Sequence, residues 1–357
     1  MKILARYIAV EFLKLLLLTV SAFVLIFVMI DLSDNVDNLL LHKVPILPSA
    51  VFCLYKIPFM VSQIAPVSVL VAVMISLGIL DKHGEITAIK AGGVRLLRVI
   101  APLLLLGLAI SVGIILMDEF ITPRSLKKVD SFKKQWFGMQ ERSIGAEGMW
   151  MRTSSGIINI KRMDLDNNQL QGVTAYHIDK PFQIKELVSA KILKWQDGRW
   201  FTDKASFRGF DAVAGAGKSA DADYVLEGLA GPEDLVNIEN MHKNMGFIEL
   251  RQYIKGLEED GYETTRYRID LYGKIAFPFV NFVMVLVGIP FALKTGRYSG
   301  IATGLGLSVA IAFSYWVVFA VTRSLGQGGV IPPLVASAFP DVIFLAIGAL
   351  MIGYVRE

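Results

Sequence analysis

The sequence predicts a polytopic α-helical membrane protein with six transmembrane helices and one all-β insert. Its composition is 54% hydrophobic and only 19% charged, with a mean hydropathy of +0.52, which is too apolar for a soluble globular protein. Several apolar runs each approach the roughly 20 residues that a helix needs to cross a bilayer. One long, more polar segment with short β-type runs separates the third apolar run from the fourth. These three observations define the fold class.

The apolar runs divide the chain in order. The six predicted spans are residues 12–30, 61–80, 96–116, 271–293, 301–321 and 334–354. We expect three segments: 1–121 with the first three spans and a helical turn at about 82–93, 122–265 with the β module and its connectors, and 266–357 with the last three spans.

Basic residues predict the orientation of the spans. The loops and ends on one side are rich in lysine and arginine: Lys2, Arg6, Lys14, Lys82, Lys90, Arg95, Arg98, Lys294, Arg297 and Arg356. The short loops on the other side contain only Lys43 and Arg323. The positive-inside rule therefore places both termini in the cytoplasm and the insert outside it.

A polar turn between the second and third spans predicts a short surface helix. Gly84 and the Gly92-Gly93 pair bound residues 85–91, which contain good helix formers. Ile86 and Ile89 share one face of this helix, and Glu85 lies on another. Such a helix either rests on the lipid or docks into a groove of a soluble partner, and spacing alone leaves both open.

The insert has the pattern of an all-β module. Residues 149–160, 172–178, 184–195 and 200–207 are predicted strands, and Asp197-Gly198 is a strong hairpin signal. We expect a sandwich or jelly roll. Residues 247–259 return to helical spacing, which predicts an amphipathic connector back to the membrane.

No catalytic, metal or cofactor site is predicted. The histidines His42, His83, His177 and His242 have no ligand spacing, and Gly217-Lys218-Ser219 lacks the earlier glycine of a phosphate-binding loop. The net charge of +4 is modest and gives no case for nucleic-acid binding. A non-catalytic protein is expected, so that any energy used in its cycle is consumed by another chain.

Three membrane features allow either a purely structural or a functional interpretation. Gly300, Gly304 and Ser308 form a small-residue stripe, suited to ordinary packing or to a movable helix seam. Lys274, Arg124 and Arg266 lie where basic side chains either bind lipid phosphates or anchor at the interface. Asp341 follows Pro340, and the local role of satisfying freed backbone amides is favoured over a functional one.

Several motifs, in this order and topology, resemble the lipopolysaccharide export permeases of the LptF/LptG family. They are Arg6-Tyr7-Ile8, the EITAIKAGG run at 85–93, Glu119-Phe120-Ile121-Thr122-Pro123, Arg266-Tyr267 with Lys274, and Ile331-Pro332-Pro333. The resemblance runs nearly end to end. Gly148-Met149-Trp150 and the segment from Tyr267 to Lys274 are more similar to LptG than to LptF.

This resemblance implies a function that composition does not. Such permeases pair as LptF with LptG in the bacterial inner membrane, sit on a cytoplasmic dimer of the ATPase LptB, and extract lipopolysaccharide for LptC and a periplasmic protein bridge. The turn helix is then a coupling helix whose glutamate, here Glu85, meets the ATPase, with Ile86, Ile89 and Lys90 beside it. Lys274, Arg124 and Arg266 become candidates for binding the lipid headgroup.

One departure from the family pattern concerns the first span. LptG-like members can have lysines near its outer end, whereas this chain has Asp31, Asp34 and Asp37. These aspartates would repel phosphate unless a divalent cation bridged them. The topology alone also leaves two alternatives: a permease that extracts another lipid or a lipoprotein, and a membrane scaffold that transports nothing. Co-purification of an ATPase would exclude the scaffold.

Overall fold

The structure is a computed structural model of the full chain. It describes residues 2–94, 96–137, 149–153, 156–164, 168–179, 183–196, 199–211, 215–216, 220–226, 244–259, 264–295 and 301–355. Two compact units are present: a helical unit of Met1–Phe137 with Asn244–Glu357, and a β unit of Gly138–Lys243. Each is described by itself.

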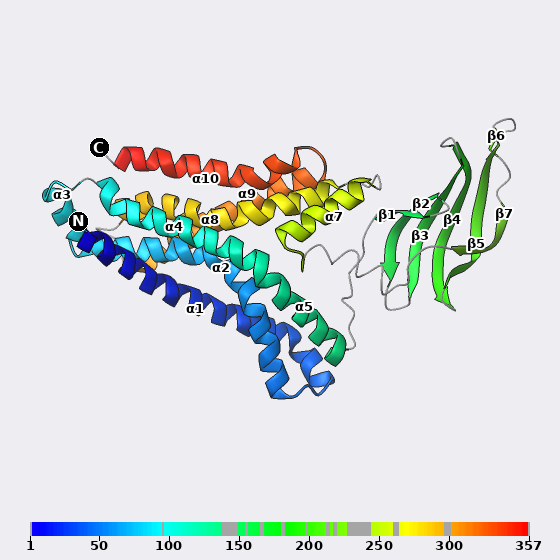
Figure 1. The fold of residues 1–357 in the computed structure, drawn as a ribbon, viewed down its shortest axis with the longest axis horizontal. Helices are drawn as coiled ribbons and strands as arrows, with labels where there is room; N and C mark the ends of the chain where they lie inside the picture. The colour runs from blue at the N-terminus through cyan, green and yellow to red at the C-terminus, as the bar shows by residue number, and fades with distance from the viewer. Residues whose placement is uncertain are drawn as a thin grey trace. The chain divides into compact units, whose positions relative to one another are not determined.

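Six long helices in the helical unit are apolar enough to cross a membrane. They are α1 (Lys2–Leu41), α2 (Ile46–Lys82), α4 (Leu96–Phe120), α8 (Thr265–Thr295), α9 (Ile301–Gln327) and α10 (Pro333–Val355). Short helices complete the unit: α3 (Glu85–Ala91), α5 (Thr122–Phe132), the π-helical turn η1 (Lys133–Phe137) and α7 (Phe247–Glu259). The predicted six spans with a β insert between the third and fourth are confirmed (Figure 1).

The first two helices are longer than a span requires. α1 has 40 residues and α2 has 37, which at 1.5 Å per residue gives lengths of about 60 and 55 Å. The hydrocarbon core of a bilayer is only about 30 Å thick. Both helices therefore extend beyond the predicted ranges 12–30 and 61–80, and α5 packs against α2.

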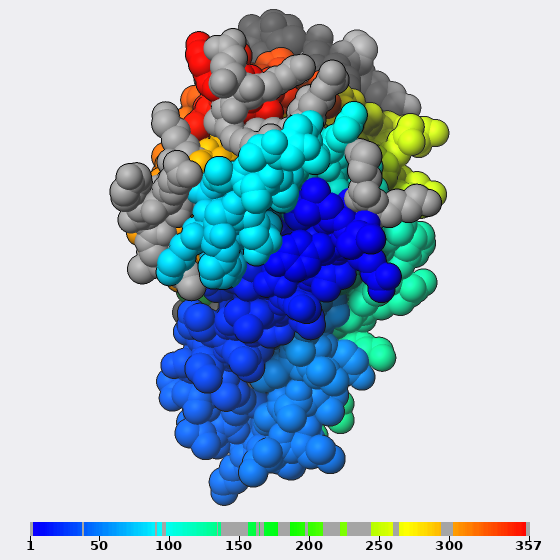
Figure 2. All heavy atoms as spheres, turned by 90° about the vertical axis from the view of Figure 1, so that its left-hand side faces the viewer, coloured from blue at the N-terminus to red at the C-terminus, as the bar shows by residue number. Residues whose placement is uncertain are grey.

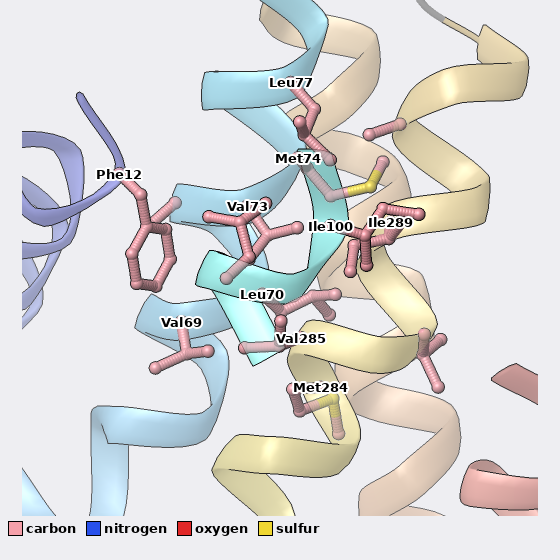
Figure 3. Close-up of a cluster of buried hydrophobic side chains, with 14 of the residues drawn as sticks. Phe12, Val69, Leu70, Val73, Met74, Leu77, Ile100, Met284, Val285 and Ile289 are labelled. Atoms are coloured by element: carbon pink, nitrogen blue, oxygen red, sulfur yellow. The ribbon is translucent and has the colours of Figure 1, made fainter. Parts of the chain in front are cut away.

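α2 and α8 form the centre of the helical unit. The most apolar stretch of α2 is 67% buried inside the unit and that of α8 is 61% buried, against 6% for α1. Side chains from α2, α4 and α8 interdigitate there, among them Leu70, Ile100 and Val285 (Figure 3). α1 adds Phe12 to this core and leaves most of its apolar surface open to lipid or to another chain.

Glycines allow close approach at three contacts among four of these helices, α4, α8, α9 and α10. A Cβ at Gly107 of α4 would lie 2.7 Å from Val285 of α8. A Cβ at Gly348 of α10 would clash with Leu286 of α8, and one at Gly326 of α9 would clash with Ala336 of α10. Small residues at such contacts let backbones pack without loss of van der Waals contact.

The β unit is one antiparallel sheet whose described strands follow the chain order. Its strands are β1 (Met149–Thr153), β2 (Gly156–Asp164), β3 (Gln169–Asp179), β4 (Gln183–Gln196), β5 (Arg199–Asp211), β6 (Gly215–Ala216) and β7 (Ala220–Leu226), with β6 and β7 both pairing with β5. One face holds an apolar cluster that includes Ile160, Val173 and Trp200. The predicted all-β insert is confirmed, and among the described strands its topology is a meander.

Candidate functional site

The short helix α3 lies at the same end of the helical unit as the start of α1 and the end of α10 (Figure 1). Gly84 and Gly93 both adopt positive φ angles, +74° and +75°, and so delimit the helix at the positions where glycine was predicted to do so. The backbone N–H of Val94 donates to the carbonyl of Ile89 at 3.3 Å, which closes the C-terminal turn.

The apolar side of α3 is anchored in its own chain. Ile86 is only 3% exposed and belongs to the same cluster as Ile8 and Phe12 of α1, while Ile89 is half-buried against that cluster. Figure 2 looks at this end, where the blue first turns of α1 lie beside the cyan segment that includes α3. The apolar side of α3 is therefore part of the same core as α1 and α2.

The polar side of α3 remains available. Glu85 is half-buried, and the Tyr7 hydroxyl donates to its Oε1 at 3.4 Å. Thr87 and Ala88 are exposed. Sequence reasoning omitted these two, although their positions between Ile86 and Ile89 on a helix could have indicated them. The Lys90 backbone belongs to α3, and its side chain lies outside what the structure describes.

At the opposite end of the helical unit, Glu119 of α4 caps α7. Its carboxylate accepts hydrogen bonds from the backbone N–H groups of Phe247, at 2.5 Å, and Ile248, at 3.2 Å. A carboxylate at a helix N-terminus satisfies amides that have no partner within the helix and interacts favourably with the helix dipole. The end of α4 therefore fixes the start of the connector helix, whose predicted range 247–259 is that of α7.

Ion pairs at this end reinforce the same connection. Lys127 of α5 lies 3.3 Å from Glu249 of α7, and Arg268 of α8 lies 2.7 Å from Glu258 of α7. The hydrogen bonds from Arg268 and Thr264 hold the pKa of the Glu258 carboxyl below its usual value.

Lys274 of α8 is half-buried and lies in an acidic environment. It interacts electrostatically with Asp118, Asp270, Glu119 and Glu249. Asp118 accepts hydrogen bonds from the hydroxyls of Ser62, at 2.6 Å, and Thr122, at 3.0 Å.

The other two predicted headgroup residues are more open than Lys274. Arg124 and Arg266 are exposed, and Arg124 donates to the backbone carbonyl of Phe120 at 2.8 Å.

The three aspartates at the end of the first span have different surroundings. Lys56 of α2 donates to both oxygens of Asp31 at 2.8 Å, and its ammonium lies 4.1 Å from the centre of the Phe52 ring. Asp34 and Asp37 are exposed. One of the three charges that we expected to repel phosphate is thus balanced by a lysine of the same chain.

The local role favoured for Asp341 is wrong. α10 continues through Pro340, and the Asp341 carboxylate accepts a hydrogen bond of 2.7 Å from the Tyr315 hydroxyl of α9. Both residues are buried, with exposed fractions of 5% and 3%. Sequence reasoning missed Tyr315 because the two residues are 26 positions apart and on different helices.

Comparison with known proteins identifies the family. The family model described as "Lipopolysaccharide export system permease LptF/LptG" matches residues 6–354. The chain belongs to the LptF/LptG family. It is 20% identical to the "Lipopolysaccharide export system permease protein LptG" of Escherichia coli K12, over 97% of this chain and 96% of that protein. It is also 20% identical to the LptG of Haemophilus influenzae, over 83% of each chain.

This result confirms the resemblance to LptF/LptG, and to LptG in particular, that the sequence motifs indicated. The protein is a permease of the lipopolysaccharide export type, with membrane-spanning helices and a β insert.

The small-residue stripe of this LptF/LptG member is only partly described. Gly300 lies outside the described residues. A Cβ at Gly304 would have no atom of the described chain within 4 Å, whereas Ser308 is fully buried and donates to the Gly304 carbonyl at 2.7 Å. Close helix contacts within the chain use Gly107, Gly326 and Gly348 instead.

Proposed function

We propose that this chain is the LptG-type permease of a transporter that extracts lipopolysaccharide from the bacterial inner membrane and passes it to a periplasmic bridge. The observation that supports it most is the family match over residues 6–354 together with six spans and one β insert. The complete transporter would also contain a partner permease of the LptF type, a cytoplasmic ATPase of the LptB type and the single-span protein LptC.

The proposed orientation places the α3 end in the cytoplasm and the β unit in the periplasm. Basic residues concentrate in the loops and termini of the α3 end. In this orientation the capped connector α7 and the half-buried Lys274 lie near the outer surface of the membrane.

We propose that α3 is the coupling helix and that Glu85 is its contact with the ATPase. Glu85 is half-buried at the polar side of α3, and the hydrogen bond from Tyr7 to its Oε1 leaves Oε2 for an arginine or lysine of another chain. Ile86 and Ile89 then act by joining α3 to α1 and α2 rather than by touching the ATPase, and Thr87 and Ala88 extend the contact surface.

Glu85→Ala is expected to reduce the amount of ATPase that co-purifies with the permease pair while the permease still inserts. A charge-assisted hydrogen bond at an interface is worth about 1.5–3 kcal/mol, or roughly a tenfold or greater loss of affinity. ATPase recovery in detergent and coupled ATP hydrolysis in vesicles would be measured.

The matched control is Glu259→Ala, which removes an exposed carboxylate at the other end of the helical unit. Tyr7→Phe keeps the Glu85 carboxylate and removes only the hydrogen bond that it accepts from Tyr7. Unchanged ATPase recovery from this variant would show that Glu85 acts itself and not through Tyr7. Equal ATPase recovery from the Glu85 variant, the Glu259 variant and the unmodified chain would remove Glu85 from the interface.

We propose that Lys274, with Arg124 and Arg266, contacts the phosphorylated headgroup of the lipid. The half-buried position of Lys274 strengthens its attraction for an anionic partner. Phosphate would take the place of nearby carboxylates such as Asp118 in this role. Lys274→Ala is expected to reduce lipopolysaccharide cross-linking from neighbouring positions several-fold, whereas Lys274→Arg retains most of it. Equal adducts in both variants, after normalisation for insertion, would exclude the headgroup contact.

A further inference from the structure

The pairing between strands of the β unit is interrupted along one row of residues. We call this row, which runs from Lys161 through Gly172 and Lys191 to Lys204, the crease. The β2–β3 ladder pairs Ile160 with Val173 and Arg162 with Gln171, and omits the Lys161–Gly172 position between them. The β3–β4 ladder likewise omits the next position in the same row, Gly172–Lys191.

The interruption continues across the rest of the sheet. The β4–β5 ladder stops at Ala190–Ala205 and resumes at Lys194–Phe201. The β5–β7 ladder changes register between Thr202 and Ala205. Where ladders are interrupted, backbone N–H and C=O groups are released from sheet pairing and can bind other groups.

Lysines line this crease on the face opposite the apolar core. Ile160, Val173 and Ala190 belong to the core, so alternation puts the adjacent Lys161 and Lys191 on the other face. The register extends this row to Lys204 on β5. Lys161, Lys191, Lys194 and Lys204 are all exposed.

A glycine makes room for the side chain of Lys161 in this row. Gly172 has φ +66°, and a Cβ at its position would lie 2.9 Å from Cδ of Lys161. The side chain of Lys161 therefore extends across Gly172 in the direction of β4.

The crease is a groove of about 750 Å³. Its lining includes all four lysines, the single acidic side chain Asp203, and a row of hydroxyls from Thr174, Ser189 and Ser206. Several ammonium groups beside hydroxyl donors match the oxygen-rich surface of a phosphate ester, while one carboxylate is too little to balance them.

We propose that this crease binds phosphate groups and, resting on the proposed function, that it holds the phosphates of lipopolysaccharide. Lysines bind phosphate as point charges without a fixed geometry, which suits a ligand that must be released again. The groove is thus a polar contact for the cargo, separate from Lys274 in the helical unit.

Lysine footprinting of the full chain in nanodiscs would test this proposal. Acetylation of Lys161, Lys191, Lys194 and Lys204 would be followed by mass spectrometry, with Lys255 of α7, 78% exposed, as the internal control. The probes are phosphorylated lipopolysaccharide, the same lipopolysaccharide after enzymatic dephosphorylation, and inorganic pyrophosphate. We expect at least threefold protection of the crease lysines by the first, little by the second, and none at Lys255.

The pyrophosphate arm distinguishes the two sources of phosphate. Protection by pyrophosphate alone assigns the crease to free phosphates, and protection only by the phosphorylated lipid assigns it to the cargo. Either result supports phosphate binding. Lys191→Gln combined with Lys204→Gln should abolish protection of Lys161 and Lys194, and the corresponding arginine pair should retain it.

Release of lipopolysaccharide by the assembled transporter is measured in parallel. Normal release without protection of the crease lysines by any probe overturns the crease proposal and leaves the proposed function standing. If the unmodified transporter releases no lipopolysaccharide, the proposed function is contradicted. Protection of the crease lysines by pyrophosphate then still tests whether the crease binds phosphate.

Discussion

Tyr315→Phe is expected to destabilise the helical unit strongly. The substitution removes the hydroxyl that donates to Asp341 at 2.7 Å and leaves a carboxylate that is only 5% exposed without this donor. Leaving a buried polar group without its hydrogen-bond partner costs about 1–3 kcal/mol, and an ionisable group inside a membrane protein has few alternative partners. Thermal unfolding of the purified protein in detergent would measure the change.

The matched control is Tyr354→Phe, which makes the same change at an 82% exposed position of α10. The double variant Tyr315→Phe with Asp341→Leu should recover much of the stability, because it removes both polar groups from the buried site. If Tyr315→Phe and Tyr354→Phe unfold at the same temperature, the buried hydrogen bond does not stabilise the contact between α9 and α10.

Gly348→Leu is expected to separate α10 from α8. Even a Cβ at this position would clash with the Leu286 side chain and lie 3.2 Å from the Leu286 backbone, and leucine adds three further carbons. Overpacking of a well-packed core costs about 1–3 kcal/mol and sometimes more. We expect lower yield of folded protein and a lower unfolding temperature.

Gly353→Leu provides the control, since a Cβ at Gly353, on the same helix, would meet no described atom within 4 Å. Leu286→Ala should rescue part of the loss in Gly348→Leu by making space for the new side chain. Equal unfolding temperatures for the two leucine variants would contradict the close packing of α8 and α10.

The sequence predicted the ends of those helices that are determined by residues close to them in the chain. The ranges of α3 and α7 follow from the glycines around 85–91 and from the apolar spacing of 247–259. The lengths of α1 and α2 did not follow, because both helices continue beyond the membrane-length apolar runs, into parts that contact each other as at the Asp31–Lys56 ion pair.

Contacts between distant residues could not be read from the sequence. Ser62 meets Asp118 across 56 positions, and Glu119 caps an amide 128 positions later. The crease of the β unit is of the same kind, because neither Gly172 nor Lys191 alone shows that neighbouring ladders are interrupted in one row. Sequence reasoning nevertheless identified Glu85 and Lys274 as candidates, from their places beside the membrane spans.

α1 has the mechanical properties of a lever. It is a single helix about 60 Å long. It contacts α3 near one end through the hydrogen bond from Tyr7 to Glu85, and it contacts α2 through Thr19 and, near the other end, through Asp31. Between these points it has little burial. A tilt of about 5° at the α3 end would swing the far end of such a rod by about 5 Å. That is about one helical turn of travel, produced without breaking any backbone hydrogen bond within the helix.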